Sequence, residues 1–252
     1  MIRYYTNLLF LILKTFAVSS LVSTKQADES TANLSRWKER WDANKIGWHL
    51  ASVNDVIKLH GDKLLKVDDT CTIESRVFVP LCGKSLDLAF FAQEESVTEV
   101  VGVDGIKQPL LDFSKEHPEL EISESGPLES YGVFKGKKVT LLKGDFFGID
   151  DEITGGKFTA IYDRASLVAS QPELRKKYVE IMGKLIAPGG KILLVTVEHD
   201  TGTGPPFAIF ESDVRSLYQD QSWVESITQL NPDETQLDAD DRLSRWYLIR
   251  AK

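Results

Sequence analysis

The sequence predicts an α/β fold with a doubly wound, mostly parallel sheet and helices on both faces of that sheet. From residue 52 onward, runs rich in β-branched and aromatic residues alternate with amphipathic segments of helical period. Glycine, acidic and arginine residues stand at the ends of several of these runs, which is where a sheet of this kind places its ligands. Both observations are typical of a Rossmann-like architecture.

The expected elements follow in chain order. Strands are expected at 76–80, 97–103, 139–143, 158–163 and 191–197. Helices are expected over 52–65, 86–93, 109–116 and 172–185. The segment 119–138 is rich in Glu, Ser and Gly, which predicts a surface excursion with a short strand at 131–134. A turn of sequence Ala-Pro-Gly-Gly at 187–190 leads into the strand that begins at residue 191.

The first expected strand ends in a glycine turn, and the second ends in an acid. Asp104 follows Gly83 by 21 residues. In doubly wound sheets such a glycine lets the backbone approach a ligand, and an acid about twenty residues later accepts hydrogen bonds from ribose hydroxyls. The pair therefore predicts a nucleotide-type cofactor site, whereas the turn by itself is equally compatible with packing. The GxGxxG pattern of dinucleotide sites is missing, which argues against a nicotinamide cofactor.

The composition narrows the class of partner. With 252 residues, 42% hydrophobic and 27% charged, the chain is long enough for one globular domain with a sizeable core. A net charge of −8 and no basic stripe argue against nucleic acid as a partner. The two cysteines, Cys71 and Cys82, form no disulfide framework and indicate a reducing compartment. The four histidines lack metal-ligand spacing, so we expect no metal.

Residues 1–33 form an N-terminal extension, and residues 34–252 form the predicted domain. The segment 8–22 is apolar but is interrupted by Lys14 and is too short for a membrane span. A basic start before an apolar run is typical of a signal peptide, and a Ser/Thr-rich, acid-free start is typical of a mitochondrial presequence. A poorly ordered extension or an over-long start is an equal alternative. Membrane association is expected only if residues 8–22 are kept as an anchor.

Trp37 and Trp41 lie four residues apart before the first strand, so they share one face of a helix. Two interpretations stay open. The rings pack on the core, as aromatic side chains usually do, or they cover an aromatic or sulfonium ligand, since tryptophan faces attract cations.

Six short motifs occur in a fixed order. They are Trp37-Lys-Glu-Arg-Trp41, Trp48-His49, Val79-Pro-Leu-Cys-Gly-Lys84, Val101-Gly-Val-Asp104, Tyr162-Asp-Arg164 and Gly204-Pro-Pro-Phe207. In this order they resemble the thiopurine S-methyltransferase family of class I S-adenosylmethionine-dependent methyltransferases, over residues 36–252. The resemblance implies an enzyme that methylates small thiols, including aromatic and heterocyclic thiols such as thiopurines.

The resemblance also implies roles for individual residues. S-adenosylmethionine would lie against Trp37 and Trp41 and over Leu81 and Gly83, with its ribose on Asp104. Asp145 and Phe146 would lie beside the adenine. Arg164 would face both the methyl donor and the acceptor as the catalytic residue. The acceptor pocket would be lined by Trp48, Pro206 and Phe207.

Several alternatives accompany these expectations. The same fold and cofactor could methylate hydrogen sulfide, thiocyanate or halide ions, or the chain could bind the cofactor without turnover. Arg164 could instead form an ion pair with Asp163 or with an acid at a helix end.

Relatives often carry a second arginine in the loop before the last strand. This loop is shorter here, and Arg242 is a candidate replacement. The resemblance further implies a cytoplasmic enzyme, which we expect to be a monomer, with secretion or mitochondrial import as alternatives.

Overall fold

The computed structural model describes residues 34–66 and 74–252. The chain divides into two compact units, residues 1–46 and residues 47–252. In the first unit, residues 34–42 form a helix. The predicted extension 1–33 and Cys71 lie outside the described residues. No helix in the described ranges is long and apolar enough to cross a bilayer, and the apolar segment 8–22 also lies outside these ranges.

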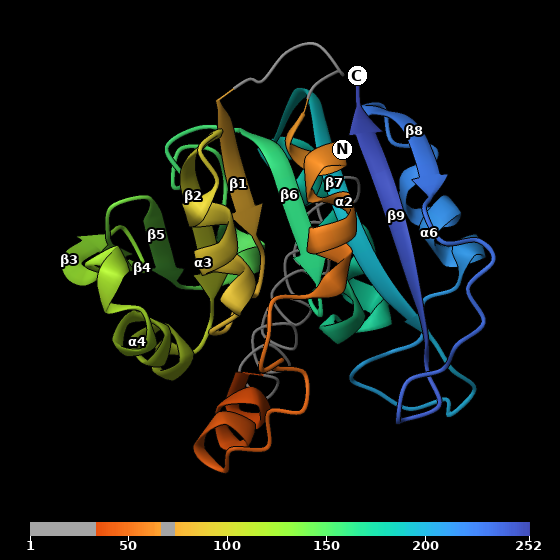
Figure 1. The fold of residues 1–252 in the computed structure, drawn as a ribbon, viewed down its shortest axis with the longest axis horizontal. Helices are drawn as coiled ribbons and strands as arrows, with labels where there is room; N and C mark the ends of the chain where they lie inside the picture. Colours follow the sequence, from red (N-terminus) through yellow and green to blue (C-terminus); the bar gives the residue numbers. More distant parts are fainter. Residues whose placement is uncertain (1–33, 67–73) are drawn as a thin grey trace, which may run out of the picture. The chain divides into compact units, whose positions relative to one another are not determined.

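The second unit is built on one twisted sheet (Figure 1). Its described strands are β1 (Ser75–Val79), β2 (Val97–Asp104), β3 (Ser123–Leu128), β4 (Tyr131–Lys135), β5 (Val139–Lys143), β6 (Phe158–Arg164), β7 (Ile186–Glu198), β8 (Val224–Gln229) and β9 (Leu243–Ala251). Their order is β3-β4-β5-β2-β1-β6-β7-β9-β8. The central strands β5, β2, β1, β6 and β7 are parallel, and the strands at both edges are antiparallel. The strand order reverses at β1, which pairs with β2 on one side and with β6 on the other. A doubly wound sheet opens its ligand crevice beside such a strand, at the carboxyl ends.

Helices cover both faces of the sheet, as the sequence predicts. They are α2 (Asp55–Leu65), α3 (Leu86–Gln93), α4 (Lys107–Glu116), α5 (Arg175–Leu185) and α6 (Glu211–Tyr218). One buried apolar cluster joins the sheet to α2, α3 and α4, and another joins the opposite face to α5 and α6. Because both faces are buried, the middle of each of β1, β2 and β6 is apolar, and their polar residues stand near the strand ends.

Side chains cap the N-termini of α2 and α3, which cover the same face of the sheet, and Asp87 connects the two N-termini. The Asn54 side chain accepts a hydrogen bond from the backbone of Val56, and the Ser85 side chain accepts one from the backbone of Asp87. Asp87 is buried, and its carboxylate accepts hydrogen bonds from the Asn54 backbone at 3.0 Å and from the Ser85 hydroxyl at 3.0 Å. The starts of α2 and α3 are therefore held together at the carboxyl edge of the sheet.

The structure departs from the predicted elements at several places. The excursion 119–138 is a β-hairpin, β3 and β4, that extends the sheet; its second strand was expected and its first was not. The turn at 187–190 is a bulge inside β7, because pairing jumps from Ile186 opposite Phe158 to Lys191 opposite Ala160. The first residues of the helix expected over 172–185 form a 3₁₀ turn, and α5 starts at Arg175.

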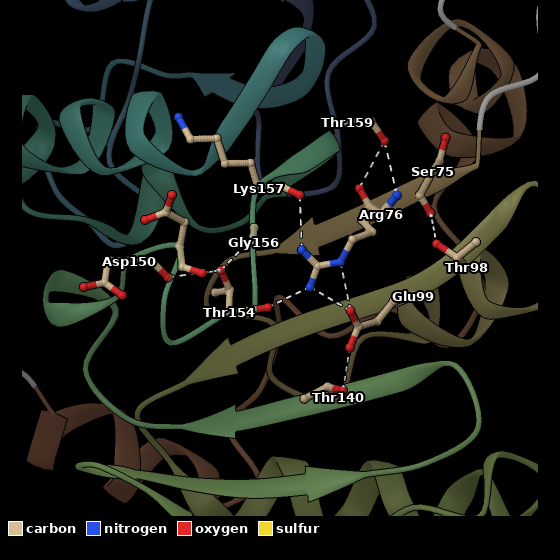
Figure 2. Close-up of polar contacts among 11 residues, drawn as sticks. Ser75, Arg76, Thr98, Glu99, Thr140, Asp150, Thr154, Gly156, Lys157 and Thr159 are labelled. Carbon is tan, nitrogen blue, oxygen red and sulfur yellow. Dashed lines mark hydrogen bonds and ion pairs between the residues drawn. The ribbon is translucent and has the colours of Figure 1, made fainter.

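An ion pair closes the amino edge of the parallel strands. Figure 2 shows the Arg76 guanidinium between Glu99 and two backbone carbonyl groups. Its Nε and Nη2 donate to the Glu99 carboxylate at 2.9 and 2.7 Å, and the carbonyl oxygens of Thr154 and Lys157 accept at 2.7 and 3.1 Å. The other Glu99 oxygen accepts from the Thr140 hydroxyl. This network joins β1, β2 and β5 to the chain that enters β6.

Replacing Arg76 by methionine should lower the free energy of unfolding by about 2–3 kcal/mol, because it leaves the half-buried Glu99 and two carbonyl groups without their donor. Urea unfolding measures this loss. Lys137→Met is the matched control, since Lys137 pairs with Glu121 in solvent and should contribute less than about 0.5 kcal/mol. Equal losses in the two variants would contradict a structural role for the Arg76 network.

Candidate functional site

The loop after β1 has an unusual backbone at the predicted cofactor position. Leu81 and Gly83 both adopt left-handed conformations, with φ of 42° and 53°. Between them, the Cys82 backbone donates to the Val103 carbonyl at 2.9 Å, which extends the pairing of β1 with β2. A left-handed leucine costs conformational energy, and such strain is concentrated at functional sites. The geometry therefore marks this loop as a ligand-binding candidate.

The Asp104 carboxylate lies at the end of β2 and holds this loop. One of its oxygens accepts the Gly83 backbone N–H at 2.9 Å, and the other accepts the Ile106 N–H at 2.8 Å. Burial raises the pKa of Asp104 to about 6, although both hydrogen bonds favour the ionised form. A carboxylate offers about four acceptor positions, so two stay available for hydroxyl donors. These acceptor positions therefore fit the neighbouring hydroxyls of a ribose.

The loop after β5 lies beside Asp104, because the Gly144 backbone donates to the Asp104 carbonyl at 3.0 Å. Asp145 is exposed, and its side chain accepts from the Phe147 backbone at 3.0 Å. Phe146 is 2% exposed, and its ring stacks on Tyr178 with centroids 4.5 Å apart. Of the two residues predicted beside an adenine, Asp145 thus presents its side chain to solvent, whereas the ring of Phe146 belongs to the core.

Arg164 and Trp48 meet at the end of β6. The Arg164 guanidinium donates to the Trp48 carbonyl at 2.8 Å, across 116 residues of sequence. Within residues 34–66 and 74–252 no ion pair of Arg164 is found, and the Asp163 carboxylate points to other partners. The alternative that Arg164 pairs with Asp163 is therefore wrong. A half-buried cation fixed next to an aromatic residue suits an anionic ligand.

Charges of both signs lie around His49, the residue after Trp48. Partial burial lowers the pKa of the neighbouring His49, and the positive charges of Lys84 and Arg164 lower it further. Lys84 pairs with Glu116 at 2.6 Å, so its charge is partly balanced. The negative charges of Glu116 and Asp87 raise the pKa of His49 and so oppose the two cations.

Pro206 and Phe207 lie against the same loop as Arg164. The Phe207 backbone donates to the Val168 carbonyl at 2.7 Å. The Pro206 carbonyl accepts from Nε2 of His199 at 3.0 Å, so this ring nitrogen carries the proton, and Nδ1 then accepts from the Thr201 hydroxyl. The structure thus brings the predicted acceptor residues Pro206 and Phe207 next to the Arg164 loop. Nothing in the sequence spacing pointed to His199, which fixes their position.

The predicted replacement for a second arginine lies in an acidic turn. Arg242 pairs with Asp240 at 2.9 Å, and its backbone donates to the Asp238 carboxylate. Arg245, three residues later, is more deeply buried and pairs with Glu198 at 3.1 Å. Both side chains are engaged with neighbouring acids, so a role for Arg242 at the acceptor stays a prediction.

Trp37 and Trp41 lie on the helix formed by residues 34–42, at the spacing that gives them a common face. The Arg40 guanidinium lies 5.7 Å from the centre of the Trp37 ring. This helix belongs to the unit of residues 1–46. Contact of the two rings with a cofactor stays a prediction.

No group of three or more His, Cys, Asp or Glu side chains in the described part of the chain is arranged to hold a metal ion. The candidate site instead combines a glycine loop, a buried carboxylate, one arginine and aromatic residues. Side chains of these kinds suit the hydroxyls of a nucleoside and an anion.

The chain is similar in sequence to proteins of known family. The sequence pattern of the thiopurine S-methyltransferase family matches residues 32–249. A thiopurine S-methyltransferase of Aliivibrio salmonicida is 35% identical over 204 residues, which cover 80% of this chain and 88% of the relative.

The fold is similar to that of solved methyltransferases. The N-methyltransferase NodS of Bradyrhizobium japonicum, in complex with S-adenosyl-L-homocysteine, aligns with a TM-score of 0.58 at 14% identity, covering 87% of this chain and 98% of NodS. The 1,6-didemethyltoxoflavin-N1-methyltransferase of Burkholderia thailandensis aligns with a TM-score of 0.57 at 14% identity, covering 88% of each chain.

Asp163→Asn should make the protein more stable relative to wild type as pH rises. Burial raises the pKa of Asp163 from 3.8 to about 7, so the folded wild type holds this proton more tightly than the unfolded chain. Wild type therefore loses this stability between about pH 4 and pH 7, whereas the amide does not titrate. Urea unfolding of both proteins across this range gives the difference. A difference that does not change with pH would show that Asp163 is ionised at its ordinary pKa.

Proposed function

This chain belongs to the thiopurine S-methyltransferase family, and we propose that it transfers a methyl group from S-adenosylmethionine to the sulfur of a small thiol. The acceptors include aromatic and heterocyclic thiols such as thiopurines. The observation that carries the proposal is the position of Arg164, which is fixed on the Trp48 carbonyl and has no ion-pair partner within the described residues. The proposal includes the expected cytoplasmic location and monomeric state.

The cofactor side rests on the two carboxyl-end loops joined by Asp104. Its free acceptor positions would take the ribose hydroxyls, and the left-handed backbone at Leu81 and Gly83 would let the loop approach the nucleoside closely. Asp145, which lies next to Asp104 through Gly144, would face the adenine. Trp37 and Trp41 are proposed to cover the sulfonium, since tryptophan faces attract cations.

The acceptor side needs an anion held in a fixed place. S-adenosylmethionine would supply a methyl group activated by its sulfonium. The thiolate sulfur would bond to the methyl carbon as the bond from that carbon to the sulfonium breaks, and S-adenosylhomocysteine would leave. The Arg164 guanidinium would hold that thiolate by charge and by its directed N–H groups. Trp48, Pro206 and Phe207 would restrict its motion and exclude water. Since the leaving group is already activated, much of the rate would come from this prearranged geometry.

The titration of Asp104 predicts how the affinity for the cofactor depends on pH. Ribose hydroxyls donate to the ionised carboxylate, and protonation near its pKa of about 6 replaces an acceptor by a donor. Binding of S-adenosylhomocysteine should therefore weaken as pH falls, by about tenfold between pH 8 and pH 5. Calorimetric titration measures this affinity. Asp104→Asn should bind weakly at every pH. Equal slopes for the two proteins would remove Asp104 from the cofactor site.

Turnover by the full chain tests the proposed activity. S-adenosylhomocysteine production is measured with S-adenosylmethionine and a panel of thiopurine, aromatic thiol, sulfide and iodide acceptors. Turnover of the organic thiols is expected, and Arg164→Gln should lower it by about 100-fold. The control Arg215→Gln removes an exposed arginine on α6 and should leave it unchanged.

The other outcomes separate the alternatives. Turnover confined to sulfide or iodide would select the small-nucleophile methyltransferase. Cofactor binding without turnover of any acceptor would select a binding protein.

A further inference from the structure

One hydroxyl group joins the loop of Arg164 to the cofactor loop. Ser166 is fully buried two residues after Arg164, and its Oγ donates to the Pro80 carbonyl at 2.6 Å. Pro80 directly precedes Leu81, where the left-handed backbone begins. The bond spans 86 residues of sequence.

Strand pairing alone gives few hydrogen bonds between the loop after β1 and the loop after β6. β1 and β6 are paired only through Val77 with Ala160 and Phe78 with Ile161, below the level of the loops. Beyond that point, the bond from Ser166 to Pro80 is the direct polar link between the two loops among the described residues.

Hydrogen bonds to Asp163 fix the turn that carries Ser166. Its two carboxylate oxygens accept from the Leu167 backbone at 3.1 Å and from the Tyr178 hydroxyl at 2.9 Å. Ala165 between them is left-handed, with φ of 59°. Both carboxylate bonds are buried, so they restrict the conformation of the turn that carries Ser166.

We propose that Ser166 is a positioning residue, whose hydrogen bond to Pro80 sets the distance between Arg164 and the cofactor loop. The inference rests on the function proposed above and adds a residue that touches neither substrate nor cofactor. In-line methyl transfer depends on the separation of acceptor and donor, and a displacement of about 1 Å can cost about 100-fold in rate. Loss of this bond should therefore reduce turnover more than it reduces cofactor binding, which rests on Asp104.

The test compares Ser166→Ala with Ser170→Ala in the full chain. Ser170 is also buried, and its hydroxyl donates to the Ser166 carbonyl at 3.2 Å, inside the same turn. Each variant thus loses one buried hydroxyl and a bond to a carbonyl inside this turn, because Ser166 Oγ also lies 3.2 Å from the Arg164 carbonyl. Ser166→Ala additionally loses the bond to Pro80, so its melting temperature should fall at least as far as that of Ser170→Ala. Only Ser166→Ala loses the link between loops. Its kcat should fall by about tenfold or more, with affinity for S-adenosylhomocysteine within about threefold of wild type.

A second readout does not depend on activity. Amide hydrogen exchange in residues 78–86 should become faster in Ser166→Ala and stay as in wild type in Ser170→Ala. Equal kcat and equal exchange in the two variants would overturn the proposal. If the wild type turned over no acceptor, the proposed function would fail, and the exchange comparison would still decide whether Ser166 holds the cofactor loop.

Discussion

The site depends on one buried carboxylate. Asp104 is 8% exposed, and burying a charge is costly unless hydrogen bonds replace water. The backbone N–H groups of Gly83 and Ile106 supply those bonds, and in doing so they fix the loop after β1 and the start of α4. The residual cost appears as a pKa of about 6. Because the same oxygens keep free acceptor positions, the interaction that orders the crevice also prepares it for a hydroxyl-bearing ligand.

The two edges of the parallel strands use charge differently. At the amino edge the N–H donors of Arg76 are bonded to Glu99 and to backbone carbonyl groups (Figure 2). The charge of Arg76 therefore stabilises the fold. At the carboxyl edge Arg164 donates to a single carbonyl, that of Trp48, and has no acid partner in the part of the chain that the structure describes. A site that binds an anion requires a cation whose N–H donors are not all bonded within the protein.

The sequence predicted the central sheet well, because a strand buried on both faces is a short apolar run that local pattern reveals. The bounds of α3 and β5 match their expected ranges. β3 was missed, since its six residues are largely exposed and contain Glu, Ser, Gly and Pro, which are typical of a loop. α6 and β8 were not predicted either.

Much of the candidate site was predicted in the same way. Asp104 and Arg164 follow apolar runs, so their place at the carboxyl ends could be inferred. Ser166 and His199 could not, because their partners Pro80 and Pro206 are defined by tertiary contact, and a single serine or histidine in a loop has no distinguishing pattern.

The central claim is that Asp104 and Arg164 face the two halves of one reaction site. A crystal structure of the full chain with S-adenosylhomocysteine tests it most directly. The account predicts both ribose hydroxyls within hydrogen-bonding distance of the Asp104 carboxylate and the thioether sulfur on the side of Arg164. A nucleoside bound elsewhere, or bound with its ribose away from Asp104, would contradict it.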